Sequence, residues 1–197
     1  MRSIKFLSPL LAVALLFGCS AGPTSSGTSS VPRIVSHGSR AYEYKSFEQL
    51  ADHALALVIV EPTGKEMAKP LPKGYGPEDA APTPYVEMNI VKVLGGSIKE
   101  TRIDLVSPGV DENTKRQALV SGGPYLIYIT PAMYGANDPA GGYVAVGGPA
   151  GVYAFEGDGF QRVDSESPSL PASITEQSPM LTKPTKSYEQ LLKEGPR

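Results

Sequence analysis

The residues that could carry acid–base, nucleophilic or metal chemistry are few and widely spaced in this sequence. It holds two histidines, His37 and His53, and one cysteine, Cys19. Nucleophilic catalysis needs a Ser or Cys beside a base, and no Gly-x-Ser-x-Gly turn is present. A zinc site needs several Cys or His ligands at defined spacing. We therefore predict no catalytic residue, no metal site, no cofactor and no enzymatic activity.

Four acidic residues around an expected hairpin turn at Gly157 could attract calcium. They are Glu156, Asp158, Asp164 and Glu166. No Asp-x-Asp-x-Asp-Gly loop is present to hold their oxygens in the geometry of a calcium loop. We favour the interpretation that they form a solvated acidic rim.

The N-terminal segment is typical of an export signal. Arg2 and Lys5 supply positive charge ahead of an apolar run from Phe6 to Phe17, and Gly18 is a small residue before a candidate cleavage point. The run has twelve residues, whereas a helix needs roughly 20 to span a bilayer. An uncleaved membrane anchor is therefore the weaker alternative.

The tetrapeptide Leu16-Phe17-Gly18-Cys19 resembles the lipobox of bacterial lipoproteins, with Phe17 where that family prefers a small residue. The resemblance implies that residues 1–18 are a signal peptide and that Cys19 is diacylated on its thiol. Two or more acyl chains give stable membrane anchoring. It also implies an exported protein, held on a membrane by lipid and facing the periplasm or the cell exterior. The alternative is a free thiol, which would be an unusual reactive group in an exported protein.

The remaining sequence predicts a tether and a single domain. Residues 19–41 are rich in Ser, Gly, Thr and Pro, as in flexible linkers. Residues 42–195 offer room for one β-rich globular domain. Without Arg2 and Lys5, 16 basic residues face 20 acidic ones, a net charge of −4, and no basic block occurs. This charge disfavours a nucleic-acid partner.

Hydrophobic patterning predicts about seven short strands and two short helices. Ser46 and Ser187 are each followed three residues later by Gln, the pattern of a helix-opening capping box. Pro62 and Pro131 are expected to end the strands before them, and residues 62–84 to form a long Pro/Gly loop. The expected strands cover residues 55–60, 85–94, 103–106, 125–129, 143–146, 152–155 and 160–163. The strands at 55–60 and 125–129 are apolar without interruption, which predicts that both of their faces are buried.

This pattern predicts a mostly β fold, a small barrel or sandwich with two short flanking helices. A helix before strand 55–60, a long loop, strand 85–94 ending in Gly95-Gly96, and Gly122-Gly123-Pro124 before the next strand resemble the layout of OB-type barrels. Within those barrels they are most similar to netrin-like and tissue-inhibitor-like modules. The resemblance covers about residues 46–130 and implies an OB-like barrel. The cysteine framework of the animal inhibitor modules is absent, so protease inhibition is not implied.

Ten tyrosines and no tryptophan occur in the sequence. We expect most of the strand tyrosines to lie in the core with their hydroxyls at the barrel rim. The strand tyrosines are Tyr85, Tyr125, Tyr128, Tyr143 and Tyr153.

The leading hypothesis is a non-enzymatic envelope lipoprotein that binds a protein or peptide through its helices and the 62–84 loop. The alternative is a small-molecule carrier or hydrolase that uses the barrel mouth, which would need a pocket with converging polar groups.

Overall fold

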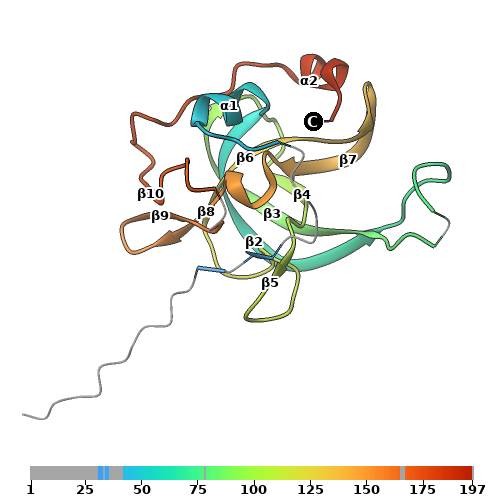
Figure 1. Ribbon diagram of the computed structural model, residues 1–197, viewed down its shortest axis with the longest axis horizontal. Helices are drawn as coiled ribbons and strands as arrows, with labels where there is room; N and C mark the ends of the chain where they lie inside the picture. The colour runs from blue at the N-terminus through green and yellow to red at the C-terminus, as the bar shows by residue number, and fades with distance from the viewer. Residues whose placement is uncertain (1–30, 33, 36–41, 78, 165–166, 197) are drawn as a thin grey trace, which may run out of the picture.

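The computed structural model describes residues 31–32, 34–35, 42–77, 79–164 and 167–196 (Figure 1). The predicted signal peptide, Cys19, His37 and Glu166 lie outside the described residues, as does most of the predicted tether. The elements in chain order are β1 Ile34–Val35, α1 Phe47–Asp52, β2 Ala56–Lys69, β3 Thr83–Gly96, β4 Arg102–Val106, β5 Val110–Asp111, β6 Tyr125–Gly135, β7 Asp138–Ala145, the 3-10 helix η1 Gly148–Gly151, β8 Val152–Glu156, β9 Gly159–Arg162, β10 Ser173–Ile174 and α2 Tyr188–Glu194.

Eight of the described strands form one sheet in the order β10-β9-β8-β6-β2-β3-β4-β7. A further pairing of β6 with β7 closes five of them, β6-β2-β3-β4-β7, into a ring. Neighbours in the ring are antiparallel except β4 and β7, which pair in parallel at Leu105 and Tyr143. β8, β9 and β10 continue the sheet beyond β6. The prediction of a mostly β fold with two short flanking helices is confirmed.

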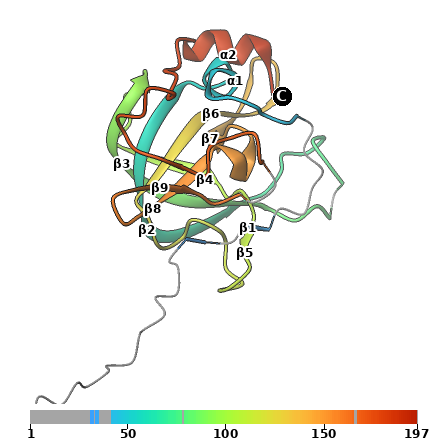
Figure 2. The same cartoon turned by 60° about the vertical axis from the view of Figure 1, so that its left-hand side comes forward.

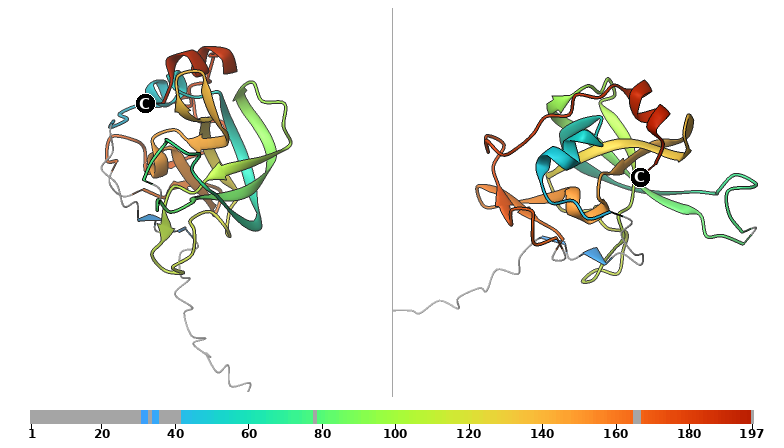
Figure 3. Two further views of the ribbon diagram at one scale, coloured as in Figure 1. Left: turned by 90° about the vertical axis from the view of Figure 1, so that its right-hand side faces the viewer. Right: turned by 45° about the horizontal axis from the view of Figure 1, so that its top comes forward.

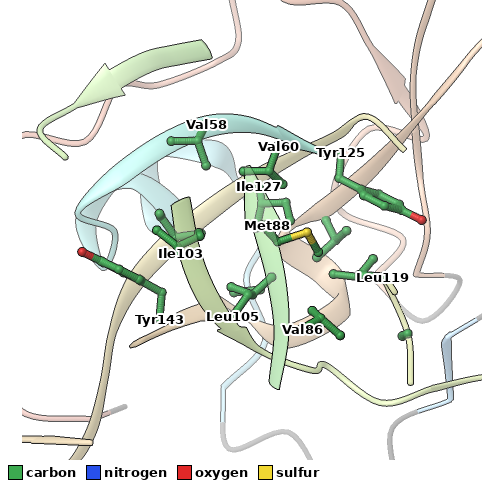
Figure 4. Packing of buried hydrophobic residues seen from close by; sticks show 14 of the residues in the cluster. Val58, Val60, Val86, Met88, Ile103, Leu105, Leu119, Tyr125, Ile127 and Tyr143 are labelled. Carbon is green, nitrogen blue, oxygen red and sulfur yellow. The ribbon is translucent and has the colours of Figure 1, made fainter. Parts of the chain in front are cut away.

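Two strands of the ring are covered on both faces, as their unbroken apolar sequences predicted. In β2, Val58 and Val60 point into the ring (Figure 4), while Leu57 and Ile59 point to a second cluster beneath α1. β6 alternates in the same way, with Ile127 inside the ring. All five side chains are at most 4% exposed. Burial of each contributes about 1.5–3 kcal/mol, so these two strands form the structural centre of the domain.

Strand β2 does not end at Pro62, so the expected loop at 62–84 is wrong in its bounds. β2 runs on to Lys69 and β3 begins at Thr83, which leaves a loop of residues 70–82. The two strands form an arm that projects from the ring (Figure 3).

Proline is tolerated in β2 because of its neighbours. β6 pairs with β2 only as far as Val60. Beyond that point no described strand pairs with this edge of β2, so the missing N–H of Pro62 breaks no hydrogen bond there. On the other edge the register shifts between Pro62 and Glu66. Residues 63–65 form this bulge, and Gly64 there has φ +82°.

Pro131 does not end β6 either, because the strand continues to Gly135. Pro131 is opposite Tyr143 of β7, and the register shifts directly after it. The segment between the expected strands 125–129 and 143–146 is therefore largely strand, since β7 begins at Asp138. β6 and β7 together form a long hairpin with its turn at residues 136–137.

Both helices begin where their capping sequences predicted. The Ser46 hydroxyl accepts a hydrogen bond from the Gln49 backbone N–H at 3.4 Å. Ser187 and Gln190 form the full reciprocal capping box at α2. The two helices lie at one end of the molecule, and the short β1–β5 pair lies at the opposite end (Figures 1 and 2).

Candidate functional site

The described histidine, His53, lies at the edge of the core beneath α1. It is the C-cap of that helix, and its Nδ1 is 2.9 Å from the Tyr44 hydroxyl. Its Nε2 is 3.5 Å from a carboxylate oxygen of Asp52. The rings of Tyr42 and Tyr44 meet the imidazole edge-on. These contacts hold Tyr42 and Tyr44 against the C-terminal end of α1.

The acidic residues considered for calcium do not converge where the structure describes them. Glu156 ends β8 and Asp158 is an exposed residue of the β8–β9 turn, whereas Asp164 is buried. Within the described ranges, no group of three or more His, Cys, Asp or Glu side chains is placed to hold a metal ion.

The most distinctive surface contact is made by Tyr75, in the loop of the β2–β3 arm. Its ring centroid is 4.6 Å from that of Tyr134 in β6, with the ring planes inclined by 37°. Its hydroxyl donates a hydrogen bond to Oδ2 of Asp138 in β7. This bond and the carboxylate charge raise the pKa of Tyr75 above its ordinary value. Tyr75 still exposes 48% of its surface, so the loop is held against the hairpin without being buried.

The turn of the same hairpin also contacts the C-terminal helix. The backbone N–H of Asn137 donates to the carbonyl of Leu192 in α2 at 2.6 Å. Gly195 lies so close to Ala136 that an added Cβ would be 3.3 Å from it. The β6–β7 turn thus joins the arm loop to α2 in one continuous surface. We call this the hairpin surface and define it by Tyr75, Tyr134, residues 136–138 and residues 192–195.

Next to the hairpin surface, three residues from β2, β3 and β4 form a cation–aromatic–carboxylate cluster. Lys69 Nζ lies 4.2 Å from the centroid of the Tyr85 ring and 3.0 Å from Oδ2 of Asp104. Burial, then the nearby Tyr134 and Asp104, raise the pKa of Tyr85 above its ordinary value. Gly142 of β7 lets this ring approach, because a Cβ there would lie 3.1 Å from Tyr85 and 2.6 Å from the Asp104 carbonyl.

The outer face of β2, β3 and β4 carries a second polar group of residues. The Glu87 carboxylate, with its side chain only 12% exposed, lies 3.0 Å from Lys65 Nζ and 3.5 Å from Arg102 Nη1. Its hydrogen bond from Lys65, followed by the charges of Lys65 and Arg102, lowers the pKa of Glu87. The Arg102 Nε also donates to Asn89 at 3.2 Å.

The strand tyrosines are buried, as the sequence predicted. Tyr125, Tyr128 and Tyr153 are 0% exposed, and their hydroxyls donate to backbone carbonyls at 2.6, 2.9 and 3.1 Å. Burial raises the pKa of Tyr125 to about 12. Burial likewise raises the pKa of Tyr128 and Tyr153 far above the ordinary value. These rings are structural.

Sequence reasoning missed Lys69, Tyr134 and Asp138. Lys69 was expected in a loop, and residues 134–138 lie beyond the proline that was expected to end β6. Local propensity offered little signal for them, because residues 63–69 are Thr-Gly-Lys-Glu-Met-Ala-Lys, mostly types that are depleted in strands.

Comparison of the chain with models of protein families, with curated proteins and with solved structures finds no match in any of the three. No helix in the described part of the chain is long and apolar enough to cross a membrane.

Proposed function

We propose that this chain is an exported lipoprotein of the cell envelope, anchored through lipid on Cys19, whose β domain binds a protein or peptide without catalysing a reaction. The anchor is supported by the charged and apolar N-terminal segment and by the lipobox-like sequence that ends at Cys19. The binding role is supported by the hairpin surface.

The observation that carries the binding role is the pair of Tyr75, which is half-exposed, and Tyr134, which is partly buried. Tyrosine is enriched in protein interfaces because its rigid ring offers large contact area and its hydroxyl remains polar. Here the two rings come from segments far apart in the sequence, and the Tyr75 hydroxyl is fixed by Asp138. The pair is therefore a pre-organised contact point, which lowers the entropic cost of binding.

The place where the chain enters the domain agrees with a binding role for the hairpin surface. β1, which lies within residues 19–41 of the predicted tether, pairs with β5 at the end of the molecule opposite α1 and α2 (Figures 1 and 2). A lipid on Cys19 would tie that end toward the membrane. The end that carries α2 and the hairpin turn would then be directed toward soluble partners.

The test is photo-crosslinking in cells, with a photoreactive amino acid at position 75 of the full chain. Phe155, which is 41% exposed on β8, is the matched control position away from the hairpin surface. We expect one discrete protein partner, identified by mass spectrometry, to be captured from position 75 and not from position 155. No capture from position 75, or the same products from both positions, in a chain shown to be folded and membrane-bound, would reject the proposal.

A further inference from the structure

Two tyrosine–aspartate clusters lie side by side on this domain, and the protein's own lysine occupies one of them. In the first, the Lys69 ammonium lies over the Tyr85 ring at 4.2 Å and beside Asp104 at 3.0 Å. In the second, the Tyr75–Tyr134 pair lies beside Asp138. Gly142 of β7 lies against Tyr85 and Asp104. Tyr134 and Asp138 belong to the same β6–β7 hairpin, so the clusters are adjacent.

The second cluster has the same chemistry but no cation from the described residues. Within the described ranges, no Lys, Arg or His lies within 4.0 Å of the Asp138 carboxylate. Tyr75 donates to Oδ2 of Asp138, while none of the described groups donates to Oδ1. The lysine of the adjacent cluster, Lys69, is itself paired with Asp104.

A guanidinium group fits these features better than other polar groups. It stacks on aromatic faces and donates planar hydrogen bonds to carboxylates. Tyr75 presents a half-exposed ring, and the Asp138 carboxylate lies at the end of that ring's own hydroxyl. A stacked guanidinium would therefore be within reach of the carboxylate.

We propose that the Tyr75–Tyr134–Asp138 cluster recognises a basic side chain, an arginine, in the peptide or protein that this domain binds. The inference rests on the proposed binding function and specifies the chemistry of the partner. The Lys69 cluster serves as the internal example, since there the same pair of groups already holds a cation.

The test uses the full chain purified in detergent with its tyrosine rings isotopically labelled, so that NMR follows each ring. The probes are the peptide acetyl-Gly-Arg-Gly-Arg-Gly-amide and its counterpart with citrulline, which keeps the shape of arginine without the charge. Tyr75→Phe and Tyr134→Phe assign the two resonances. We expect the arginine peptide to shift both resonances and the citrulline peptide to shift neither.

Two matched variants test the role of the carboxylate. Asp138→Asn should weaken binding of the arginine peptide about tenfold, the effect of losing one charge-assisted hydrogen bond. Asp158→Asn, an exposed aspartate in the β8–β9 turn, should leave it unchanged. Thermal unfolding of both variants verifies that each is folded.

Equal shifts from both peptides, no shift from the arginine peptide, or equal affinity of the two variants would overturn the inference. Failure of the inference is distinguishable from failure of the proposed function. Crosslinking from position 75 to a segment without basic residues would refute arginine recognition and leave the binding function standing. Absence of any crosslink from that position would reject the binding function itself.

Discussion

Tyr75 in the arm loop and Asp138 at the start of β7 are joined by a hydrogen bond from the tyrosine hydroxyl to the carboxylate. The bond connects the tip region of one long hairpin to the turn of another. Because the Tyr134 ring lies beside Tyr75 at 4.6 Å, two contacts hold the loop. Both contacts are made by Tyr75, so we expect the position of the loop to depend on this residue.

Replacing Tyr75 by alanine should release the loop without unfolding the domain. Aromatic pairs contribute about 0.5–1.5 kcal/mol beyond their buried area, and this one is at the surface. We expect faster proteolytic cleavage and faster amide hydrogen exchange within residues 70–82 only. Tyr75→Phe keeps the ring pair and should give an intermediate rate. Unchanged exchange in the alanine variant would mean that the loop is held by other contacts.

The two glycines Gly64 and Gly96 should respond very differently to alanine although their φ angles are nearly equal, +82° and +79°. At Gly64 an added Cβ meets nothing within 4 Å. The alanine variant should therefore lose only the free energy that the left-handed backbone conformation costs, about 1–2 kcal/mol. At Gly96 it would overlap the Leu55 carbonyl oxygen and lie 2.8 Å from Ala56 Cα. The cost there should reach about 3 kcal/mol or more. Urea unfolding measures both, and similar midpoints would contradict the close approach of β3 to residue 55.

Acidification should remove part of the stability that Glu87 provides. Its pKa is lowered in the folded state by Lys65 and Arg102, so the folded protein favours the charged form. Its contribution to stability is therefore present above the pKa that Glu87 has in the unfolded chain. It is lost as the pH falls through the lower pKa that Glu87 has in the folded protein. Unfolding midpoints measured from about pH 6 to pH 3 should fall less steeply in Glu87→Gln than in the native protein. Glu61→Gln, an exposed carboxylate of β2, is the control and should follow the native curve.

Alkaline pH should destabilise the core through its tyrosines. Burial raises the pKa of Tyr125 from 10.0 to about 12, so the folded state favours the neutral phenol. Its stabilising effect is complete below pH 10 and is lost as pH rises toward 12. Ultraviolet titration should show the buried tyrosines ionising only together with unfolding. Tyr125→Phe should shift the alkaline unfolding midpoint upward, and an unshifted midpoint would contradict the assignment.

Replacing Cys19 by serine should abolish lipidation and release the protein from the membrane. The prediction follows from the sequence around residue 19, because the acyl chains would be attached to that thiol. Cell fractionation and intact-mass measurement check it. Recovery of a membrane-bound native chain that still begins at Met1 and carries no lipid would show that residues 1–18 are not a cleaved lipoprotein signal.

Much of the fold follows from local patterning. Serine caps predicted both helix starts, since the capping hydrogen bonds involve residues three apart. Unbroken apolar runs at 55–60 and 125–129 predicted strands covered on both faces, because only a strand buried on both sides needs apolar residues at every position. The same reasoning placed Tyr125, Tyr128 and Tyr153 in the core.

The sequence by itself predicted both α-helices, seven of the ten described strands and the burial of the strand tyrosines. The tertiary structure decided how far β2 and β6 extend, because a proline ends a strand only where a neighbour requires its N–H. It also decided the candidate site, because ring closure and the two long hairpins bring Tyr75 to Asp138 and Lys69 to Asp104. Such contacts depend on strand order and register, which local propensity does not encode.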